Sequence, residues 1–272
     1  MPPATTTSYS PAAISWYDSA ILKPKLEQLV DFDRINARTM RFSVGAVNVR
    51  TGNFAHFDNA SDRITPEHVI ASGAVPPAFP LVEIGGERYW DGGLVSNTPL
   101  DCVLSASSKL DTLVFQVDLW SALGEIPRDL AGVVERMKEI QYSSRTRAAT
   151  DEFRERRRLR GALQRLLAKL PPELAASAEA KMLDEVSDPA AYNIVELIYR
   201  SPTYEGEAKD YDFSRQTMED HWQAGHRDAS RALAHPEVLE LPDDPAGVAV
   251  FDFSRRSGQP SDAPAKAMKE AR

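Results

Sequence analysis

Cysteine is almost absent from this 272-residue sequence, in which Cys102 is the single example. A lone cysteine excludes an intramolecular disulfide and a zinc site built from thiolates, and we expect Cys102 to be a small buried residue rather than a nucleophile. Apolar runs of the roughly 20 residues that cross a bilayer as a helix are absent as well. The N-terminus lacks the basic and apolar regions of a signal peptide. These absences favour a cytoplasmic protein.

Positive charge is in the minority, with 32 lysines and arginines against 40 acidic residues and a formal net charge of −8. Phosphate binding needs a basic surface, so this balance argues against nucleic acid as a partner. The five histidines form no His-Glu-x-x-His pattern, and the spacing of His221 and His226 is poor for joint metal binding. We expect His56, His68 and His235 to be surface or capping residues. The sequence therefore predicts no metal and no cofactor.

Short helix and strand patterns alternate within residues 14–122. Thr65 as N-cap and Pro66 after it open a helix that stops by Gly73, and Gly85-Gly86 provides a hairpin turn. The expected elements are helices at 14–30, 66–72 and 99–107 and strands at 40–49, 54–57, 81–84, 87–90 and 110–119. The first two strands form another hairpin. The strand at 87–90, the glycines after it, the next helix and the apolar run at 110–119 predict a parallel crossover whose last strand is covered on both faces.

Helical patterns dominate the rest of the chain. Apolar residues recur at helical spacing from residue 128, with an interruption near Gly161, and Pro171-Pro172 ends that helical region. A strand is expected at 192–199 and a helix at 214–234, with Met218, Trp222 and Leu233 as candidate core residues. We divide the chain into a disordered N-terminus (1–13), an α/β part (14–122), a mainly helical extension (123–253) and a disordered tail (254–272).

Arginines gather in the first part of this helical region. They are Arg145, Arg147, Arg154, Arg156, Arg157, Arg158 and Arg160. The favoured interpretation is a solvated helix face that is partly neutralised by Asp151, Glu152 and Glu155. Attraction to anionic lipid headgroups is the alternative, and it leaves peripheral membrane contact open.

Asp91 is the acidic residue with the clearest chemical potential. Its neighbours are Tyr89 and Trp90 before it and Gly92, Gly93, Ser96 and Asn97 after it. Partial desolvation at an aromatic strand end would raise the pKa of the carboxyl and improve it as a base. The glycines can take positive φ, and without side chains they let a substrate or partner backbone come close. Ser96 and Asn97 are candidates to support the same pocket. Spacing alone favours an Asx-type turn between a strand and a helix.

A longer stretch around Asp91 resembles the C-terminal part of patatin-like phospholipases. The resemblance covers roughly residues 42–119, through Ala71-Ser72-Gly73-Ala74-Val75-Pro76-Pro77-Ala78-Phe79-Pro80, Ile84-Gly85-Gly86, Tyr89-Trp90-Asp91-Gly92-Gly93-Leu94 and Asn97-Thr98-Pro99-Leu100. Residues 30–36 and the helical region to about residue 233 are similar to a bacterial subgroup with a C-terminal helical extension. The resemblance implies an α/β fold, namely the C-terminal portion of a three-layer α/β/α domain with a mainly parallel sheet, followed by a mostly helical extension.

This resemblance implies a lipid acyl hydrolase with a Ser-Asp dyad and no cofactor. In such enzymes a serine in a Gly-x-Ser-x-Gly elbow attacks an ester carbonyl, an aspartate takes its proton, and a glycine-rich loop provides the oxyanion hole. By residue-for-residue transfer, Asp91 is the general base, and Gly92 and Gly93 complete its motif. The implied substrate is a lipid or another acyl ester.

The nucleophile elbow and the oxyanion loop do not occur among the 272 residues. Ser72 lacks the first glycine of an elbow and lies at a position that is not the family's nucleophile. We therefore expect a truncated hydrolase chain that is inactive alone, because the base acts only together with its serine. A parallel sheet without its first strands should also expose an apolar edge and an uncovered face, so the chain is expected to aggregate or to need a partner.

Two other hypotheses remain open. The chain is alternatively a non-catalytic membrane- or protein-interaction module on a decayed hydrolase scaffold. In the second hypothesis, a separate polypeptide supplies the elbow and the two chains reassemble. The sequence predicts no particular oligomeric state.

Overall fold

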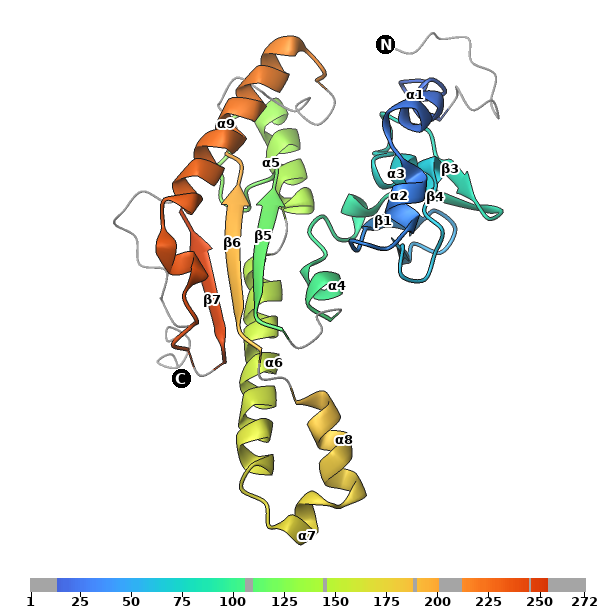
Figure 1. Cartoon of the computed structure of the whole chain (residues 1–272). Coiled ribbons are helices and arrows are strands. Elements are labelled where there is room, and N and C mark those ends of the chain that lie inside the picture. Colours follow the sequence, from blue (N-terminus) through green and yellow to red (C-terminus); the bar gives the residue numbers. More distant parts are fainter. Residues whose placement is uncertain are drawn as a thin grey trace, which may run out of the picture. The chain divides into compact units, whose positions relative to one another are not determined.

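In the computed structural model, the described residues are 14–105, 110–143, 146–187, 190–200, 212–244 and 246–253. They form two compact units, each with a sheet of its own (Figure 1). The first unit takes in the described residues within 1–103, 120–146 and 201–212, and the second takes in those within 104–119, 147–200 and 213–272. The class is α/β, as predicted, with a parallel three-stranded sheet and several helices. The predicted disordered ends lie outside the described residues.

The first unit is built on a four-stranded antiparallel sheet in the order β2-β1-β4-β3. Its elements are α1 (Leu22–Leu29), α2 (Phe32–Asn36), β1 (Ser43–Asn48), β2 (Phe54–Asp58), α3 (Pro66–Ser72), β3 (Val82–Ile84), β4 (Glu87–Asp91), the 3-10 helix η2 (Gly92–Leu94), the start of α4 (Leu100–Ser105), and α5 (Leu130–Tyr142). Both predicted hairpins are confirmed. Gly85 and Gly86 have φ angles of 61° and 83°, which explains why glycine occupies the turn between β3 and β4.

Helix α3 begins as the sequence predicts, with Thr65 as N-cap and Pro66 in the first turn. A capping box closes through His68, whose Nδ1 accepts a hydrogen bond from the Thr65 backbone N–H at 3.0 Å. Burial lowers the pKa of His68, and this favours the neutral ring that can accept that bond. The prediction of His68 as a capping residue is confirmed. Helix α1 is shorter than the predicted helix at 14–30.

A buried amide fastens the segment before β1 to the strand pair. Asn59 is almost fully buried, and its Nδ2 donates to the carbonyl oxygens of Ile35 and Met40 at 2.7 and 2.9 Å. Its Oδ1 accepts from the Phe42 backbone N–H at 3.0 Å. One buried side chain therefore makes hydrogen bonds to three backbone groups of the segment before β1.

The second unit is built on a three-stranded parallel sheet in the order β5-β6-β7. Its elements are the end of α4, β5 (Thr112–Asp118), α6 (Thr146–Leu167), α7 (Pro172–Ala175), α8 (Ala178–Val186), β6 (Tyr192–Ile198), α9 (Arg215–Leu233), the 3-10 helix η4 (Pro236–Leu239) and β7 (Val248–Asp252). The predicted strand at 192–199 and the predicted helix at 214–234 are confirmed. The predicted interruption near Gly161 is wrong, because α6 continues through that residue. Strand β7 had no counterpart in the sequence analysis.

The predicted parallel crossover from β4 to β5 is wrong. Strand β4 lies between β1 and β3, so both of its edges are already paired and none is left for a parallel neighbour. Strand β5 pairs instead with β6, in parallel, from Thr112↔Tyr192 to Asp118↔Ile198. The two strands of the predicted crossover therefore belong to different sheets.

Strand β5 is covered on only one face, although its continuous apolar run predicts cover on both. Val114 lies on the buried face, whereas Leu113, Phe115 and Val117 are 38%, 46% and 60% exposed. The exposed residues share a face with Val195 of β6, which packs with α9 and η4. Among the described residues, those two helices pack on β6 and β7 on this face, and the outward side chains of β5 stay exposed. That missing strands cause an uncovered face stays a prediction.

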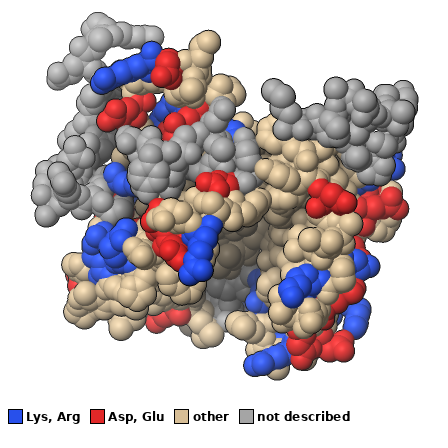
Figure 2. Space-filling model, turned by 90° about the horizontal axis from the view of Figure 1, so that it is seen from above, with Lys and Arg blue, Asp and Glu red and all other residues tan. Residues whose placement is uncertain are grey.

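The arginine-rich stretch lies on α6, and its favoured interpretation is confirmed in part. Arg156 and Arg158 approach acids of the same helix, with N···O distances of 3.8 and 3.7 Å. Arg157 is an exception, since it is buried with its guanidinium 4.8 Å from the centre of the Tyr192 ring, and it donates to the Ala190 carbonyl oxygen. Figure 2 shows basic and acidic side chains interspersed on the described part of one face. The side chains of Arg145 and Arg147 are not among those that the structure describes.

The predicted core residues of α9 are exposed rather than buried. Met218, Trp222 and Leu233 are 54%, 76% and 71% exposed, while Ala232 packs with Val195 in the core. Helical spacing identified residues on one side of α9, but the sheet contacts the small side chains of the helix instead. In the described parts of the chain, no helix combines the length and the apolar character that crossing a membrane requires.

Candidate active site

Asp91 is the last residue of β4, at the point where the strand enters η2. Its backbone is fixed on both sides, because it faces Ala46 across the β1–β4 ladder and its N–H donates to the Ala74 carbonyl oxygen at 3.1 Å. Ala46 and Ala74 are both buried, so small side chains surround the strand end. The carboxylate therefore starts from a rigid position in the first unit.

The Asp91 side chain is half-buried, and one of its oxygens is held by the following turn. Oδ1 accepts a hydrogen bond from the Gly93 backbone N–H at 2.7 Å, which makes Asp91 the N-cap of η2. Burial raises the pKa of the Asp91 carboxyl, and the Gly93 N–H offsets only part of that rise. No described residue donates a hydrogen bond to Oδ2. The carboxyl thus has one oxygen held by the turn and one without a donor among the described residues.

Gly92 is required because two pieces of backbone meet there. A Cβ on Gly92 would lie 2.7 Å from both the carbonyl carbon and the oxygen of Gly45 in β1. Gly45 is itself crowded, since a Cβ on it would overlap the Phe54 ring. Neither Gly92 nor Gly93 has a positive φ, so the expectation that they serve for backbone conformation is wrong and close approach is the reason for Gly92.

Gly93 lies between the Asp91 carboxylate and the Asn97 carboxamide. A Cβ on Gly93 would be 3.1 Å from Asp91 Oδ1 and 3.0 Å from Asn97 Oδ1. Asn97 is exposed, and its Nδ2 donates to the Tyr142 carbonyl oxygen at the end of α5, at 2.8 Å. Ser96 is half-buried, and its backbone N–H donates to the Gly92 carbonyl oxygen at 2.9 Å. The structure thus places all the sequence-predicted site residues around one turn.

Ser72 does not resemble an activated nucleophile. It lies in α3, and its hydroxyl donates to the carbonyl oxygen of Val69 in the same helix at 2.9 Å. Among the described residues, no group of three or more histidine, cysteine or acidic side chains is placed to hold a metal ion. Cys102 is half-buried, so the expectation of a buried cysteine is only partly met.

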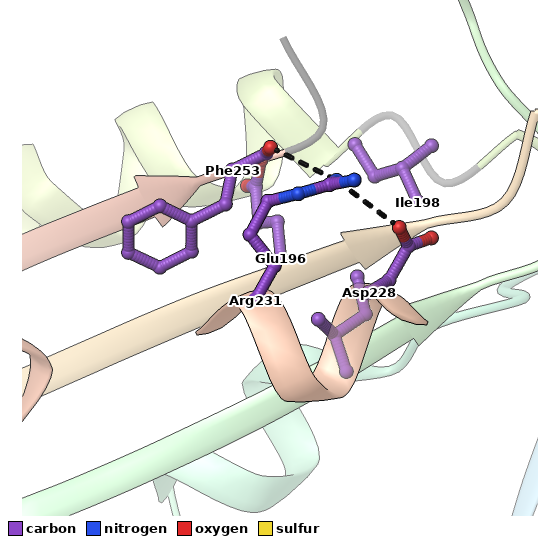
Figure 3. A pocket seen from close by; sticks show the side chains of 6 residues that line it. Glu196, Ile198, Asp228, Arg231 and Phe253 are labelled. Carbon is purple, nitrogen blue, oxygen red and sulfur yellow. Dashed lines mark hydrogen bonds and ion pairs between the residues drawn. The ribbon is translucent and has the colours of Figure 1, made fainter. Parts of the chain in front are cut away.

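A small depression in the second unit is unrelated to Asp91. It lies between the end of β6, helix α9 and Phe253, and Figure 3 shows Arg231 at its centre. Arg231 Nη1 already donates to Asp228 Oδ1 at 3.2 Å and to the Phe253 carbonyl oxygen at 3.3 Å. Its space of about 180 Å³, open mouth included, is below the roughly 300 Å³ at which small-molecule sites begin. This depression is too small for a substrate pocket.

Sequence reasoning missed three residues that shape the turn. For Gly45 the sequence does contain a signal, because a glycine inside a strand indicates that another backbone approaches closely. Ala74 accepts the Asp91 N–H through its backbone, and Tyr142 binds Asn97 through its backbone. Any residue type can make those two contacts, so the sequence carries no signal for them.

The fold and the site define an α/β protein with a half-buried acid at a strand end, held by a glycine turn. Comparison with family models gives two matches: a patatin-like phospholipase model matches residues 10–104, and a patatin phospholipase model matches residues 140–245. No curated protein matches the chain. The chain belongs to the patatin-like phospholipase family, which acts on lipid substrates.

Proposed function

We propose that this chain carries the base-bearing part of a lipid acyl hydrolase, with Asp91 as the general base. The observation that supports this most directly is the state of the carboxyl. Burial raises its pKa, Oδ1 is fixed by Gly93, and Oδ2 has no donor among the described residues. A general base works best when its pKa approaches the working pH, and burial shifts Asp91 in that direction.

The proposed chemistry uses Oδ2 as the proton acceptor. A serine hydroxyl presented to it would transfer its proton to Oδ2 while the serine oxygen forms a bond to the ester carbonyl carbon. The proton on Asp91 then passes to the departing alcohol oxygen as the ester C–O bond breaks. The Gly93 N–H keeps the carboxyl in a single orientation through both transfers.

The serine of this reaction has to come from residues outside the 272, because they contain no Gly-x-Ser-x-Gly. We propose that the chain is inactive alone and that Ser72 does not replace the missing nucleophile. The Ser72 hydroxyl donates to a carbonyl oxygen of its own helix, and no described acidic or histidine side chain is hydrogen-bonded to it. A base without its nucleophile provides no dyad catalysis.

Ester hydrolysis by the purified 272-residue chain tests the inactivity. We expect no turnover of a nitrophenyl ester above the buffer blank, and an Asp91→Asn variant should give the same trace. Turnover that disappears in Asp91→Asn would show that the chain is active alone and would overturn this part of the proposal.

The role of Asp91 is tested in a longer protein that adds an elbow and an oxyanion loop before residue 42. Asp91→Asn should then lower kcat by about 10²–10⁴-fold, the usual contribution of a general base. Glu83→Gln, at an exposed carboxyl on neighbouring β3, is the matched control and should leave kcat unchanged. A longer protein that hydrolyses esters equally well with Asp91→Asn would disprove the assignment.

A second candidate function is a non-catalytic interaction module on the same scaffold. The uncovered apolar face of β5 favours it, because large exposed apolar patches mark contact surfaces. The two candidates differ in the longer protein, where the module hypothesis predicts no hydrolysis at all.

A further inference from the structure

Helix α5 is amphipathic, but its apolar side faces outward and its polar side faces the rest of the unit. The outward residues are Leu130 (83% exposed), Val133 (47%), Val134 (36%), Met137 (59%) and Ile140 (57%). At 3.6 residues per turn these five lie within an arc of about 120° along the whole helix. We call them the α5 stripe. A helix of a globular protein normally turns such a stripe toward the core.

The polar side of α5 makes its contacts with the rest of the first unit. Arg136 Nη2 donates to the Ala122 carbonyl oxygen at 2.6 Å, and Nη1 binds Glu139 Oε2 at 2.7 Å. The Arg136 and Glu139 side chains are only 20% and 17% exposed. The ring of Tyr142 lies 5.6 Å from that of Trp120. These contacts fix the rotation of the helix, so the outward direction of the stripe follows from how α5 is held.

The C-terminal end of α5 lies beside the candidate active site. The Tyr142 carbonyl oxygen accepts the Asn97 Nδ2 hydrogen bond at 2.8 Å, and α5 contacts η2, the turn that Asp91 caps. Asn97 in turn lies against Gly93. The C-terminal end of the helix that carries the stripe therefore lies next to the turn that Asp91 caps.

We propose that the α5 stripe is the surface through which this protein contacts a lipid layer, with the helix lying in the plane of the interface and Asp91 near it. The substrate class rests on the proposed function, whereas the lipid contact itself does not. The stripe contains no charged residue over its full length. The charged residues of α5 are Glu135, Arg136, Lys138 and Glu139, two of each sign. None of these four side chains is exposed, so the side that α5 turns outward is apolar. An apolar side matches acyl chains better than an anionic surface or a charged protein.

Vesicle co-sedimentation of the 272-residue chain tests this surface, with phosphatidylcholine vesicles and, separately, anionic phosphatidylserine vesicles as probes at low and high salt. We expect binding to the phosphatidylcholine vesicles that salt does not weaken. A Met137→Asp/Ile140→Asp double variant should bind at least about tenfold more weakly, since insertion depends on buried apolar area. Met218→Asp on α9 is the matched control, because its side chain is 54% exposed in the other unit, and it should bind like the wild type. Asp91→Asn should also bind normally, which separates this test from that of the catalytic base.

A second measurement follows the stripe directly. A polarity-sensitive dye on Met137→Cys, in a Cys102→Ser background, should shift its emission to the blue when vesicles are added. Absence of vesicle binding, or a dye that does not respond, would overturn the proposal. Binding only to anionic vesicles that high salt abolishes would assign the contact to the arginines of α6 instead. A double variant that loses self-association but keeps its vesicle binding would assign the stripe to a protein contact.

Discussion

Two carboxylates of the first unit, Asp58 and Asp91, should respond in opposite ways to the same change to asparagine. Asp58 ends β2 and is 5% exposed. Its Oδ2 accepts from Ser43 Oγ at 2.5 Å and from Arg41 Nε at 2.6 Å, and its Oδ1 accepts from the Ala60 N–H at 2.8 Å. Burial alone would raise the pKa of Asp58, but the bonds from Ser43, Ala60 and Arg41 outweigh it and hold the pKa at about 2.

The magnitude follows from linkage between protonation and folding. The pKa of Asp58 falls from 3.8 to about 2, so its ionised form stabilises the fold at neutral pH by about 2 kcal/mol. Because the folded pKa is the lower one, this stability is present above pH 4 and is lost as the pH falls toward 2. The pKa of Asp91 is raised instead, so the ionised carboxyl opposes folding at neutral pH. Its contribution is favourable only below the unfolded pKa and is lost as the pH rises through the folded one.

Urea denaturation at pH 7 measures both changes. Trp16, Trp90 and Trp120 lie in the first unit and report its unfolding by fluorescence. Asp58→Asn should lose about 2 kcal/mol, because the amide cannot replace the charge next to Arg41. Asp91→Asn should lose nothing or gain stability, because asparagine Oδ1 can still accept the Gly93 N–H. Equal losses in the two variants would refute the reasoning, as would an Asp58→Asn penalty that persists unchanged at pH 2.

Three further changes test packing. The two in the first unit are read from the midpoint of the same fluorescence curve, and Arg157→Ala, in the second unit, is read from urea denaturation followed by circular dichroism. Gly92→Ala places a Cβ 2.7 Å from the backbone of β1 and should cost about 1–3 kcal/mol, whereas Gly73→Ala meets no atom within 4 Å and should cost little. Asn59→Ala removes the three hydrogen bonds that this buried amide makes to backbone groups and should cost about 3 kcal/mol; a loss below 1 kcal/mol would contradict its role. Arg157→Ala, which removes a buried cation from an aromatic ring, should cost about 3 kcal/mol, and the exposed Arg156→Ala should stay near zero.

The local parts of the fold could be predicted from the sequence because their causes are local. Gly85 and Gly86 determine the β3–β4 turn by their positive φ angles, and Thr65-Pro66 marks the first turn of α3. The crossover from β4 to β5 failed for a non-local reason. Whether β4 has a free edge depends on β1, about 40 residues earlier, and no feature of the crossover segment records that pairing. The division of the chain at residue 122 stays a prediction, since the two compact units interleave along the sequence.

The sequence predicted which residues form the candidate site, but it did not predict why each of them is needed there. The sequence placed Asp91, Gly92 and Gly93 on one strand-end turn, and the structure does the same. It did not show that Gly92 is needed for the approach of Gly45, because that contact joins segments far apart in the chain. The raised pKa of Asp91 was expected from its aromatic neighbours, and burial is indeed its leading cause.

Helices α5 and α9 show why hydrophobic periodicity alone does not locate a core. The spacing of apolar residues predicted helix in both regions, and in α5 the residues at that spacing do lie on one side. Periodicity states which residues share a face, but the direction of that face depends on what holds the helix. Arg136 holds α5 through a backbone carbonyl oxygen of the preceding loop. The apolar side of the helix therefore points outward. An Arg136→Ala variant should therefore free the helix to turn its stripe inward. Its vesicle binding should weaken although no stripe residue has changed, and unchanged binding would show that Arg136 does not orient α5.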